Sequence, residues 1–284
     1  MDAKLLFIHA LSPLHAGTGQ GVGAIDLPIA REKATNLPYL PGSSLKGVLR
    51  DACTDGTTRK EVFGPETTHA ADYAGSVHFT DQRLLFMPIR SLSGTFAWVT
   101  SPLVLRRFSR DVALAQGADF PANVPDVTPS DGCLVTNATN LIGNDGKVTL
   151  EDIPLTPARS AEMDAWAQKF VAVLFPQSSE WKDVFTARLC LVHDEIFGFL
   201  VETATEVVAR IALDDEVKTV KQGALWYEES LPAESILSGL VVASPVRAEA
   251  HTVFKTVDDI IANPLQLGGH ATVGRGLCSL HMVS

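Results

Sequence analysis

A run of glycines near the start of the chain constrains its fold more than any other feature. Residues 15–26 read His-Ala-Gly-Thr-Gly-Gln-Gly-Val-Gly-Ala-Ile-Asp, and no regular period of apolar residues passes through them. Because glycine adopts backbone conformations that other residues avoid, we expect a loop, with room for a hairpin, from Ser12 to Pro41. The segments on either side of this loop must therefore supply the core.

Those segments predict a mixture of strands and helices. Apolar runs favour strands at 4–11, 77–90 (interrupted at Pro88), 237–244 and 277–283. Helical spacing favours helices at 43–52, 100–116, 179–191 and 257–261, whereas 162–175 fits either state. Strands separated by helices indicate an α+β fold, and no linker is marked, so we expect a single domain over residues 1–284.

Two stretches stand apart from this pattern. Residues 117–157 are rich in proline, glycine, asparagine and aspartate, which predicts an irregular insertion. From Val207 to Lys221, alternating apolar residues flank the turn-forming sequence Asp214-Asp215-Glu216. This pattern predicts a β-hairpin.

Composition narrows the classes of function. The chain has 284 residues, is 46% hydrophobic and carries a net charge of −10, which argues against unspecific binding of nucleic acid. The charge is uneven, however. Residues 31–60 hold six basic and three acidic side chains, and residues 83–110 hold five arginines and no acid. A basic stripe on an acidic body therefore stays open beside the alternative of an ordinary solvated surface.

Targeting and cysteine signals are absent from the sequence pattern. No uninterrupted apolar run reaches about 18 residues, and the start Met1-Asp2-Ala3-Lys4 lacks the features of a signal peptide, so we expect a cytoplasmic protein without a membrane span. The cysteines form no CxxC pair and no zinc spacing, which predicts buried free thiols and no disulfide. They are Cys53, Cys133, Cys190 and Cys278.

The segment after Pro41 is a candidate phosphate site. Ser43 or Ser44 fits the N-cap of a helix, and the free amides of a helix start attract anions. Lys46 falls in the first turn and Arg50 lies one turn further on the same face. The alternative is an ordinary capped helix with Lys46 in water. The spacing differs from that of a nucleotide-binding P-loop.

A second glycine segment, residues 268–276, offers a similar possibility near the end of the chain. The amides around Gly269, Gly274 and Gly276, together with Arg275, suit an extended polyanion. The segment precedes a strand rather than a helix, so it does not match a dinucleotide fingerprint. The alternative is a long turn between a helix and a strand.

Asp26 is the one acid between Asp2 and Glu32, and His15 precedes it in the same loop. A histidine and an aspartate can divide acid and base roles in RNA cleavage, and an aspartate can hold hydrated Mg²⁺. Glu228 or Glu229 could add a second carboxylate. The plainer alternatives are a turn-forming aspartate and a solvated strand end. No nucleophile elbow, HExxH motif or aromatic RNA-binding strand motif is present.

Taken together, these segments resemble the Cmr-type backbone subunits of type III-B CRISPR effector complexes, in the RAMP superfamily. The resemblance is densest in LHAGTGQGVGAIDL, PYLPGSSLKGVLR and VHFTDQRLLFMPIRSLSGTFAWVTSPLVL, and continues in GALWYEESLP and LGGHATVGRG. It implies a modified ferredoxin-like (RRM-like) palm with inserted segments and a β-hairpin thumb, which we place within residues 191–222. Such subunits stack as a helical filament along a guide RNA.

The resemblance also implies an activity and its residues. Members bind guide CRISPR RNA and cut the paired target RNA at regular intervals in antiviral defence, as divalent-metal-dependent endoribonucleases. The cleavage-associated aspartate falls on Asp26, a possible metal ligand, and Mg²⁺ is the expected metal. Lys46 matches a guide-contacting lysine, while His15 and Glu228 match positions beside the active site. The implied partners are guide RNA, target RNA, other copies of the chain and other subunits.

Two main rivals stay open at the level of sequence. One is a non-catalytic structural subunit that binds guide RNA and partners. The other is a standalone guide-processing ribonuclease that uses His15 as a metal-independent base. A DNA-directed variant is a third alternative.

Overall fold

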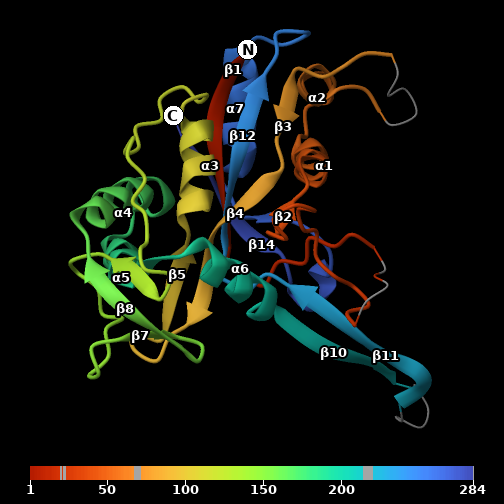
Figure 1. Ribbon diagram of the computed structural model, residues 1–284. Helices are drawn as coiled ribbons and strands as arrows, with labels where there is room; N and C mark the ends of the chain where they lie inside the picture. Colours follow the sequence, from red (N-terminus) through yellow and green to blue (C-terminus); the bar gives the residue numbers. More distant parts are fainter. Residues whose placement is uncertain (20, 22–23, 67–71, 214–219, 284) are drawn as a thin grey trace.

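The computed structural model describes residues 1–19, 21, 24–66, 72–213 and 220–283, and the chain has a mixed α+β fold (Figure 1). Its centre is an antiparallel sheet in the order β14 (Leu277–Met282), β1 (Asp2–Ala10), β12 (Ile236–Ala243) and β4 (Gln82–Arg90). β1 forms here because its apolar run is almost wholly buried between two neighbours. Short strands extend the sheet: β2 (Tyr39–Leu40), β3 (Val77–Phe79) and β13 (Leu265–Gln266).

The sheet continues from β4 into a second set of strands. Their order is β5 (Phe96–Thr100), β9 (Leu189–Val192), β6 (Gly132–Val135), β8 (Ile153–Arg159) and β7 (Val148–Leu150). The prediction of an irregular insertion at 117–157 is therefore wrong from Gly132 onward. Residues 118–131 contain no helix or strand, but β6, β7 and the start of β8 fall within the interval. These strands find their hydrogen bonds in distant partners, which local composition does not reveal.

Pro88 does not interrupt the predicted strand, because β4 runs through it to Arg90. The ladder between β4 and β12 ends at Phe86, and Pro88 pairs with Trp98 of β5. Beyond Phe86 the missing amide of proline breaks no bond to β12, which is how a strand tolerates this residue.

Helices pack around both parts of the sheet (Figure 1). The undecided segment 162–175 is helical, because the Ser160 side chain accepts a hydrogen bond from the amide of Met163 and starts α4. Helix α5 ends at Arg188, earlier than predicted, and α7 is longer than the predicted 257–261. Neither α2 nor α6 was predicted. The bounds are α1 Gly42–Ala52, α2 Gly56–Phe63, α3 Pro102–Val112, α4 Ala161–Leu174, α5 Ser179–Arg188, α6 Asp194–Thr203 and α7 Ala250–Ile261.

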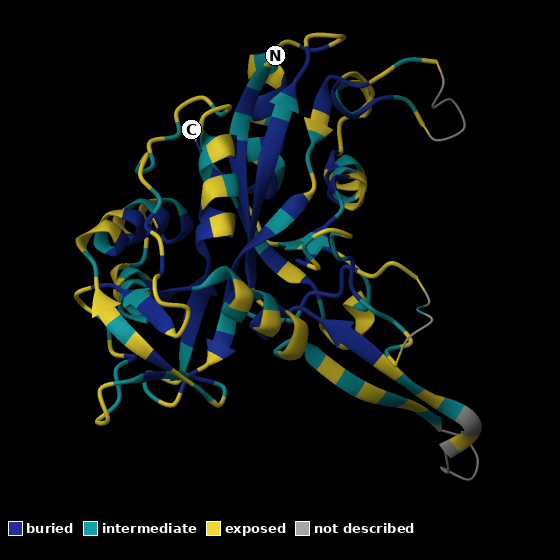
Figure 2. Cartoon of the chain, in the orientation of Figure 1, coloured by how far each residue is buried: buried dark blue, intermediate teal, exposed yellow. Residues whose placement is uncertain are grey.

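Aromatic side chains join these layers into one core. Phe86 on β4 meets Phe170 on α4 edge to face, with ring centroids 4.8 Å apart, and Phe7 on β1 packs against Phe108 on α3 at 5.7 Å. The central strands are buried, whereas the outer helices alternate between buried and exposed faces (Figure 2). The sheet is thus a rigid support for the loops at its end.

A two-stranded hairpin projects from this body (Figure 1). It consists of β10 (Glu206–Leu213) and β11 (Val220–Ser230), with Arg210 opposite Trp226 and Ile211 opposite Leu225. The predicted hairpin is present, but the interval 191–222 ends inside β11 and begins with β9 and α6. The predicted turn at Asp214–Glu216 lies outside the described residues.

Candidate functional site

The glycine-rich loop joins the base of the hairpin through Asp26 and Leu27. Leu27 exchanges main-chain hydrogen bonds with Tyr227 and Glu229 at 3.0 Å each. Asp26 Oδ2 accepts a hydrogen bond from the amide of Tyr227 at 2.8 Å, and the Asp26 side chain is exposed. Among the described residues no hydrogen bond reaches its other oxygen, Oδ1. The hairpin therefore holds one carboxylate oxygen and leaves the other facing solvent.

His15 lies inside the same junction. Its ring is buried, its Nδ1 lies 2.6 Å from the carbonyl oxygen of Glu229, and its own carbonyl accepts a hydrogen bond from Gly269 at 2.9 Å. Its ring stacks on that of His270, with centroids 4.3 Å apart and planes 6° apart. The structure thus brings the two predicted glycine segments together, and His15 supports their contact.

Glu228 is the centre of a polar cluster on the inner face of the hairpin. Its carboxylate accepts hydrogen bonds from Trp226 Nε1 at 2.8 Å and Arg210 Nε at 3.1 Å, and His270 Nδ1 lies 3.2 Å from it. Burial acts to raise the pKa of Glu228, but these hydrogen bonds and His270 outweigh it and lower the pKa below its usual value. Glu228 is therefore held ionised by fixed partners.

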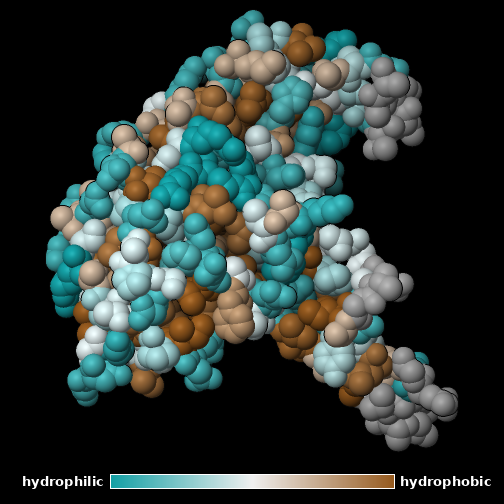
Figure 3. All heavy atoms as spheres, in the orientation of Figure 1, coloured by the Kyte–Doolittle hydropathy of each residue, from teal (hydrophilic) through white to brown (hydrophobic). Residues whose placement is uncertain are grey.

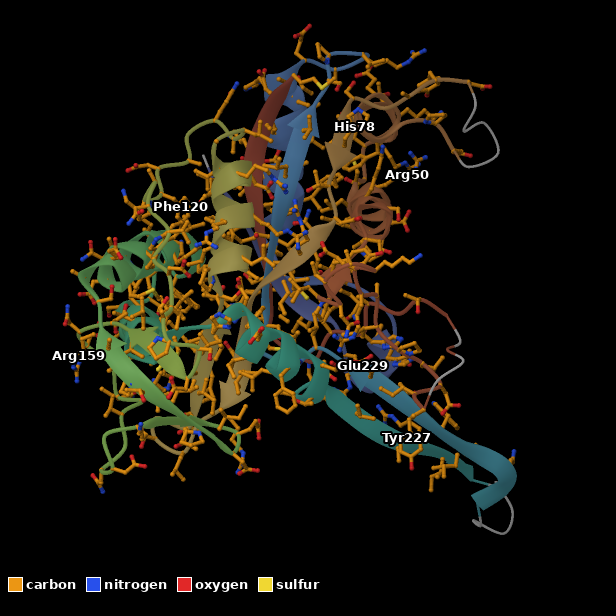
Figure 4. The ribbon with its side chains drawn as sticks, viewed as in Figure 1. Arg50, His78, Phe120, Arg159, Tyr227 and Glu229 are labelled. Carbon is orange, nitrogen blue, oxygen red and sulfur yellow. The ribbon has the colours of Figure 1, made fainter. Side chains whose placement is uncertain are left out.

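Glu229 has a structural role instead of serving as a second free carboxylate. It is buried, and its carboxylate accepts hydrogen bonds from Arg31 Nη2 at 2.6 Å, the Thr205 hydroxyl at 2.9 Å and the Ile29 amide at 3.1 Å. Figure 4 shows Glu229 at the base of the hairpin and Tyr227 further along it. The buried ion pair with Arg31 fastens β11 to the segment that carries Asp26.

The start of α1 differs from the prediction in one respect. Neither Ser43 nor Ser44 caps the helix, because Pro41 is the N-cap residue and the Gly42 amide donates to Asp81 Oδ1 at 2.9 Å. Both serines are exposed in the first turn. A fixed carboxylate therefore already satisfies one amide of the helix start, and the serine hydroxyls are the groups that face solvent.

Lys46 and Arg50 point toward neighbouring backbone. Lys46 Nζ donates to the Val77 carbonyl at 3.1 Å, and burial, followed by the charge of Arg50, lowers the pKa of Lys46. Arg50 donates to the Gly64 carbonyl and lies on the α1 side of the molecule (Figure 4). An ammonium group has three N–H donors, so the contact with Val77 orients Lys46 and leaves donors for a further acceptor.

The second glycine loop uses its amides within the protein. The amides of Gly269, Gly274 and Gly276 donate to His15, Ala271 and Pro13 at 2.9, 3.0 and 2.8 Å. This corrects the expectation that they are free to hold phosphate. Arg275 Nη1 pairs with Glu206 Oε2 at 2.8 Å. A Cβ atom at Gly276 would lie 2.0 Å from the Leu267 carbonyl oxygen, so close packing requires glycine there.

Of the two alternatives that the sequence left open for residues 83–110, the structure favours an ordinary surface over a basic stripe. Each of the five arginines lies against an acidic side chain, which neutralises the stripe where it forms. The pairs are Arg83–Asp111 at 2.8 Å, Arg90–Glu151 at 3.2 Å, Arg106–Asp126 at 3.0 Å, Arg107–Glu32, and Arg110–Asp111 at 3.4 Å.

The described part of the chain holds no cluster of three or more histidine, cysteine, aspartate or glutamate side chains able to bind a metal ion. The four cysteines are buried free thiols. Within the same residues no helix is long and apolar enough to cross a membrane. A metal ion here would take Asp26 Oδ1 as its protein ligand and fill its other positions with water and phosphate oxygens, as Mg²⁺ often does.

The sequence assigned no role to three residues of this site, namely His270 of the second glycine loop, Arg210 and Trp226. They meet at Glu228 only through the fold. The one available signal was the alternation of β11, which puts Trp226 and Glu228 on the same face of the strand.

Comparison with known proteins finds one matching family and two similar relatives, described below. The model of the RAMP superfamily matches residues 7–279. The CRISPR system Cmr endoribonuclease Cmr4 of Pyrococcus furiosus is 36% identical over 97% of this chain and 94% of its own length. The Cmr subunit Cmr4 of Saccharolobus solfataricus is 25% identical over 99% of this chain and 96% of its own.

Solved structures show the same similarity to Cmr proteins. The crystal structure of oligomeric Cmr4 from Pyrococcus furiosus superposes with a TM-score of 0.75 and 29% identity, over 99% of this chain and 98% of that one. A chain of the type III-B Cmr-beta complex bound to cognate target RNA has a TM-score of 0.77 at 19% identity, over 100% and 98% of the two chains. This second likeness concerns the fold.

Proposed function

Because this chain belongs to the RAMP superfamily, and within it to the Cmr4 family, we propose that it is a backbone subunit of a type III-B CRISPR effector complex. In this role it binds guide RNA and cuts the paired target RNA. Its partners are further copies of itself, the other subunits and the two RNAs, and its place is the cytoplasm. A relative of the chain is named an endoribonuclease and crystallises as an oligomer, which supports both parts of the proposal.

The palm of this subunit is proposed to be ferredoxin-like. Along the chain, β1, α1, β4, β12, α7 and β14 follow the order strand, helix, strand, strand, helix, strand. In space the four strands lie in the order β14, β1, β12, β4. A sheet in which the first strand lies between the third and the fourth supports an RRM-like palm, into which the other strands are inserted.

The proposal that this chain cleaves RNA depends on Asp26. It is an exposed carboxylate, fixed by one oxygen to the Tyr227 amide at the base of the hairpin. In the proposed reaction a ribose 2′-hydroxyl gives its proton to solvent water while its oxygen bonds to the adjacent phosphorus. The 5′-oxygen then leaves and takes up a proton, which gives a 2′,3′-cyclic phosphate and a 5′-hydroxyl. The hairpin, as thumb, distorts the target so that the attacking and leaving oxygens lie in line, and such alignment alone lowers a barrier by several kcal/mol.

The remaining candidate residues are proposed to bind the RNA backbone or the metal ion. Ser43, Ser44, Lys46 and Arg50 on α1 present hydroxyl and cationic groups to the guide backbone, and base pairing supplies sequence recognition. Asp26 Oδ1 is the free oxygen that would hold Mg²⁺. When bound, that ion neutralises developing phosphate charge.

The test is Asp26→Asn in the assembled complex with guide RNA and labelled target RNA. Because the amide keeps the Tyr227 contact and removes the charge, we expect target binding to persist and cleavage to fall by about 10²-fold or more. Asp183→Asn, an exposed position on α5, is the matched control. Cleavage by Asp26→Asn at the control rate would remove Asp26 from the reaction.

The rival functions give different results in the same assay. A structural subunit binds RNA and leaves the target intact. A standalone processing ribonuclease cuts repeat RNA as an isolated chain without divalent metal, and its His15 must reach the substrate. The buried position of His15 favours target cleavage within a complex over that reading.

A further inference from the structure

His270 has contacts that the proposed function does not explain. It stacks on His15 with ring planes 6° apart, and its Nδ1 lies 3.2 Å from Glu228 Oε2. That nitrogen is buried and makes no hydrogen bond of good geometry. The residue has a φ of 65°, in the left-handed region that non-glycine residues seldom adopt. The loop thus maintains an uncommon backbone conformation that places this ring between two partners.

The partners of His270 belong to different segments of the chain. His15 comes from the segment that leads into the Asp26 loop, and Glu228 comes from the hairpin strand β11. Glu228 also receives Arg210 of β10 and Trp226, so the contact reaches both strands of the hairpin. His270 is therefore the side chain at which the second glycine loop, the Asp26 loop and the hairpin meet.

Asp26 is connected to this junction by a few hydrogen bonds. The main chain on either side of Glu228 pairs with Leu27, and the amide of Tyr227 binds the Asp26 carboxylate. A tilt of the hairpin base would carry Tyr227 and Asp26 with it. A displacement of about 1 Å in a reacting group can lower a rate by about 10²-fold.

We infer that His270 is a positioning residue, which fixes the angle between the hairpin and the glycine loop and thereby places Asp26 over one phosphodiester of the target. The inference rests on the proposed function of target cleavage and deepens it. His270 acts through Glu228 and His15 and makes no contact with the reacting atoms. The stack on His15 sets the plane of the ring, and the approach to Glu228 sets the position of β11.

Two substitutions separate these contacts. His270→Phe retains an aromatic ring that can stack on His15 and removes the nitrogen that faces Glu228. His270→Asn retains an N–H donor, suits the left-handed backbone and removes the stack. The same substitutions at His251, an exposed histidine on α7, are the matched controls. Each variant is assembled with guide RNA and assayed under single-turnover conditions with end-labelled target RNA.

We expect His270→Phe to cleave about tenfold more slowly and to spread its cuts over neighbouring phosphodiesters, with target affinity close to that of the wild type. His270→Asn should recover part of the rate and of the cut-site precision. A residue that only stabilises the fold would change the melting temperature and leave the cut positions and the rate per active complex unchanged, and that result in both variants would overturn the inference. Since the wild type and the His251 variants test cleavage itself, this failure is distinct from failure of the proposed function.

Discussion

At the scale of single residues, the stacked histidines make the site sensitive to acid. Burial and the charge of His15 lower the pKa of His270 from 6.5, although Glu228 acts to raise it. The fold therefore prefers the neutral ring. The stability that this neutral ring contributes is complete above pH 6.5 and is lost as the pH falls from 6.5 toward the lower pKa of the folded state. The titratable and charged groups facing this ring are His15, Glu228, Arg210 and Arg275.

We accordingly expect the melting temperature of the chain to fall as the pH is lowered from about 7.5 to about 5.5. Glu228, with its lowered pKa, adds to the loss only below its ordinary value of 4.5. His281, whose pKa burial also lowers, contributes in the same direction. The difference between wild type and His270→Phe isolates the part due to His270, and a variant with the same pH dependence as the wild type would contradict this account.

The sequence indicated which residues were candidates for the site better than it indicated which side chains they would contact. Asp26 was recognisable as a lone acid in a glycine loop, and the structure places it against the hairpin. The partners of Glu228 were not recognisable, because Arg210 and His270 reach it only after the hairpin and the loop have formed. The free amides expected at Gly269 and Gly276 are used inside the protein, since a glycine pattern records backbone freedom and not the bonds that the backbone makes.

At the scale of elements, two glycines on helix α1 should respond oppositely to alanine. A Cβ atom at Gly42 would lie 2.3 Å from the Phe79 carbonyl oxygen, whereas one at Gly47 would meet no atom within 4 Å. Gly42→Ala should therefore lower the free energy of unfolding by roughly 1–3 kcal/mol through steric overlap. Gly47→Ala should raise it by about 0.5–1 kcal/mol, because alanine favours a helix interior.

Urea unfolding of the isolated chain measures both changes, and each variant controls for the other. Equal effects would show that Gly42 does not lie close against the Phe79 carbonyl at the end of β3. The close approach at Gly42 also fixes the direction from which α1 presents Ser43 and Ser44.

Elements with a strong local signal were the easier ones to predict. The strands β1, β12 and β14 are long apolar runs, and the hairpin shows alternation, so both kinds were recognised. The strands β6 and β7 were missed because each is short and lies among turn-forming residues. β6 pairs with β8 and β9, and such pairings stabilise strands whose own sequence favours none.

At the scale of the whole molecule, the net charge of −10 means that attraction to RNA must be local. The arginines of residues 83–110 are paired, so the proposed RNA surface relies on Lys46 and Arg50 of α1. Lys46→Ala should weaken RNA binding to a similar degree for every sequence and reduce the slope of log K against log salt by about 1. Titrations of the assembled complex at several salt concentrations measure this slope.

Lys169→Ala on α4 is the control, because this lysine pairs with Asp119 on another part of the molecule. It should leave the slope unchanged. If Lys46→Ala also left it unchanged, the bond to Val77 would be the whole role of Lys46, and the guide contact would lie elsewhere.

The outward face of the hairpin has a consequence for the life of the protein in the cell. Val207, Ile211, Leu225 and Tyr227 are 47%, 50%, 55% and 41% exposed, and apolar residues run along the hairpin in Figure 3. A newly made copy that has bound neither RNA nor a neighbouring subunit exposes this apolar surface to other proteins in the cell. We therefore expect its expression to be matched to that of the other subunits, since excess copies would aggregate or be degraded by proteases.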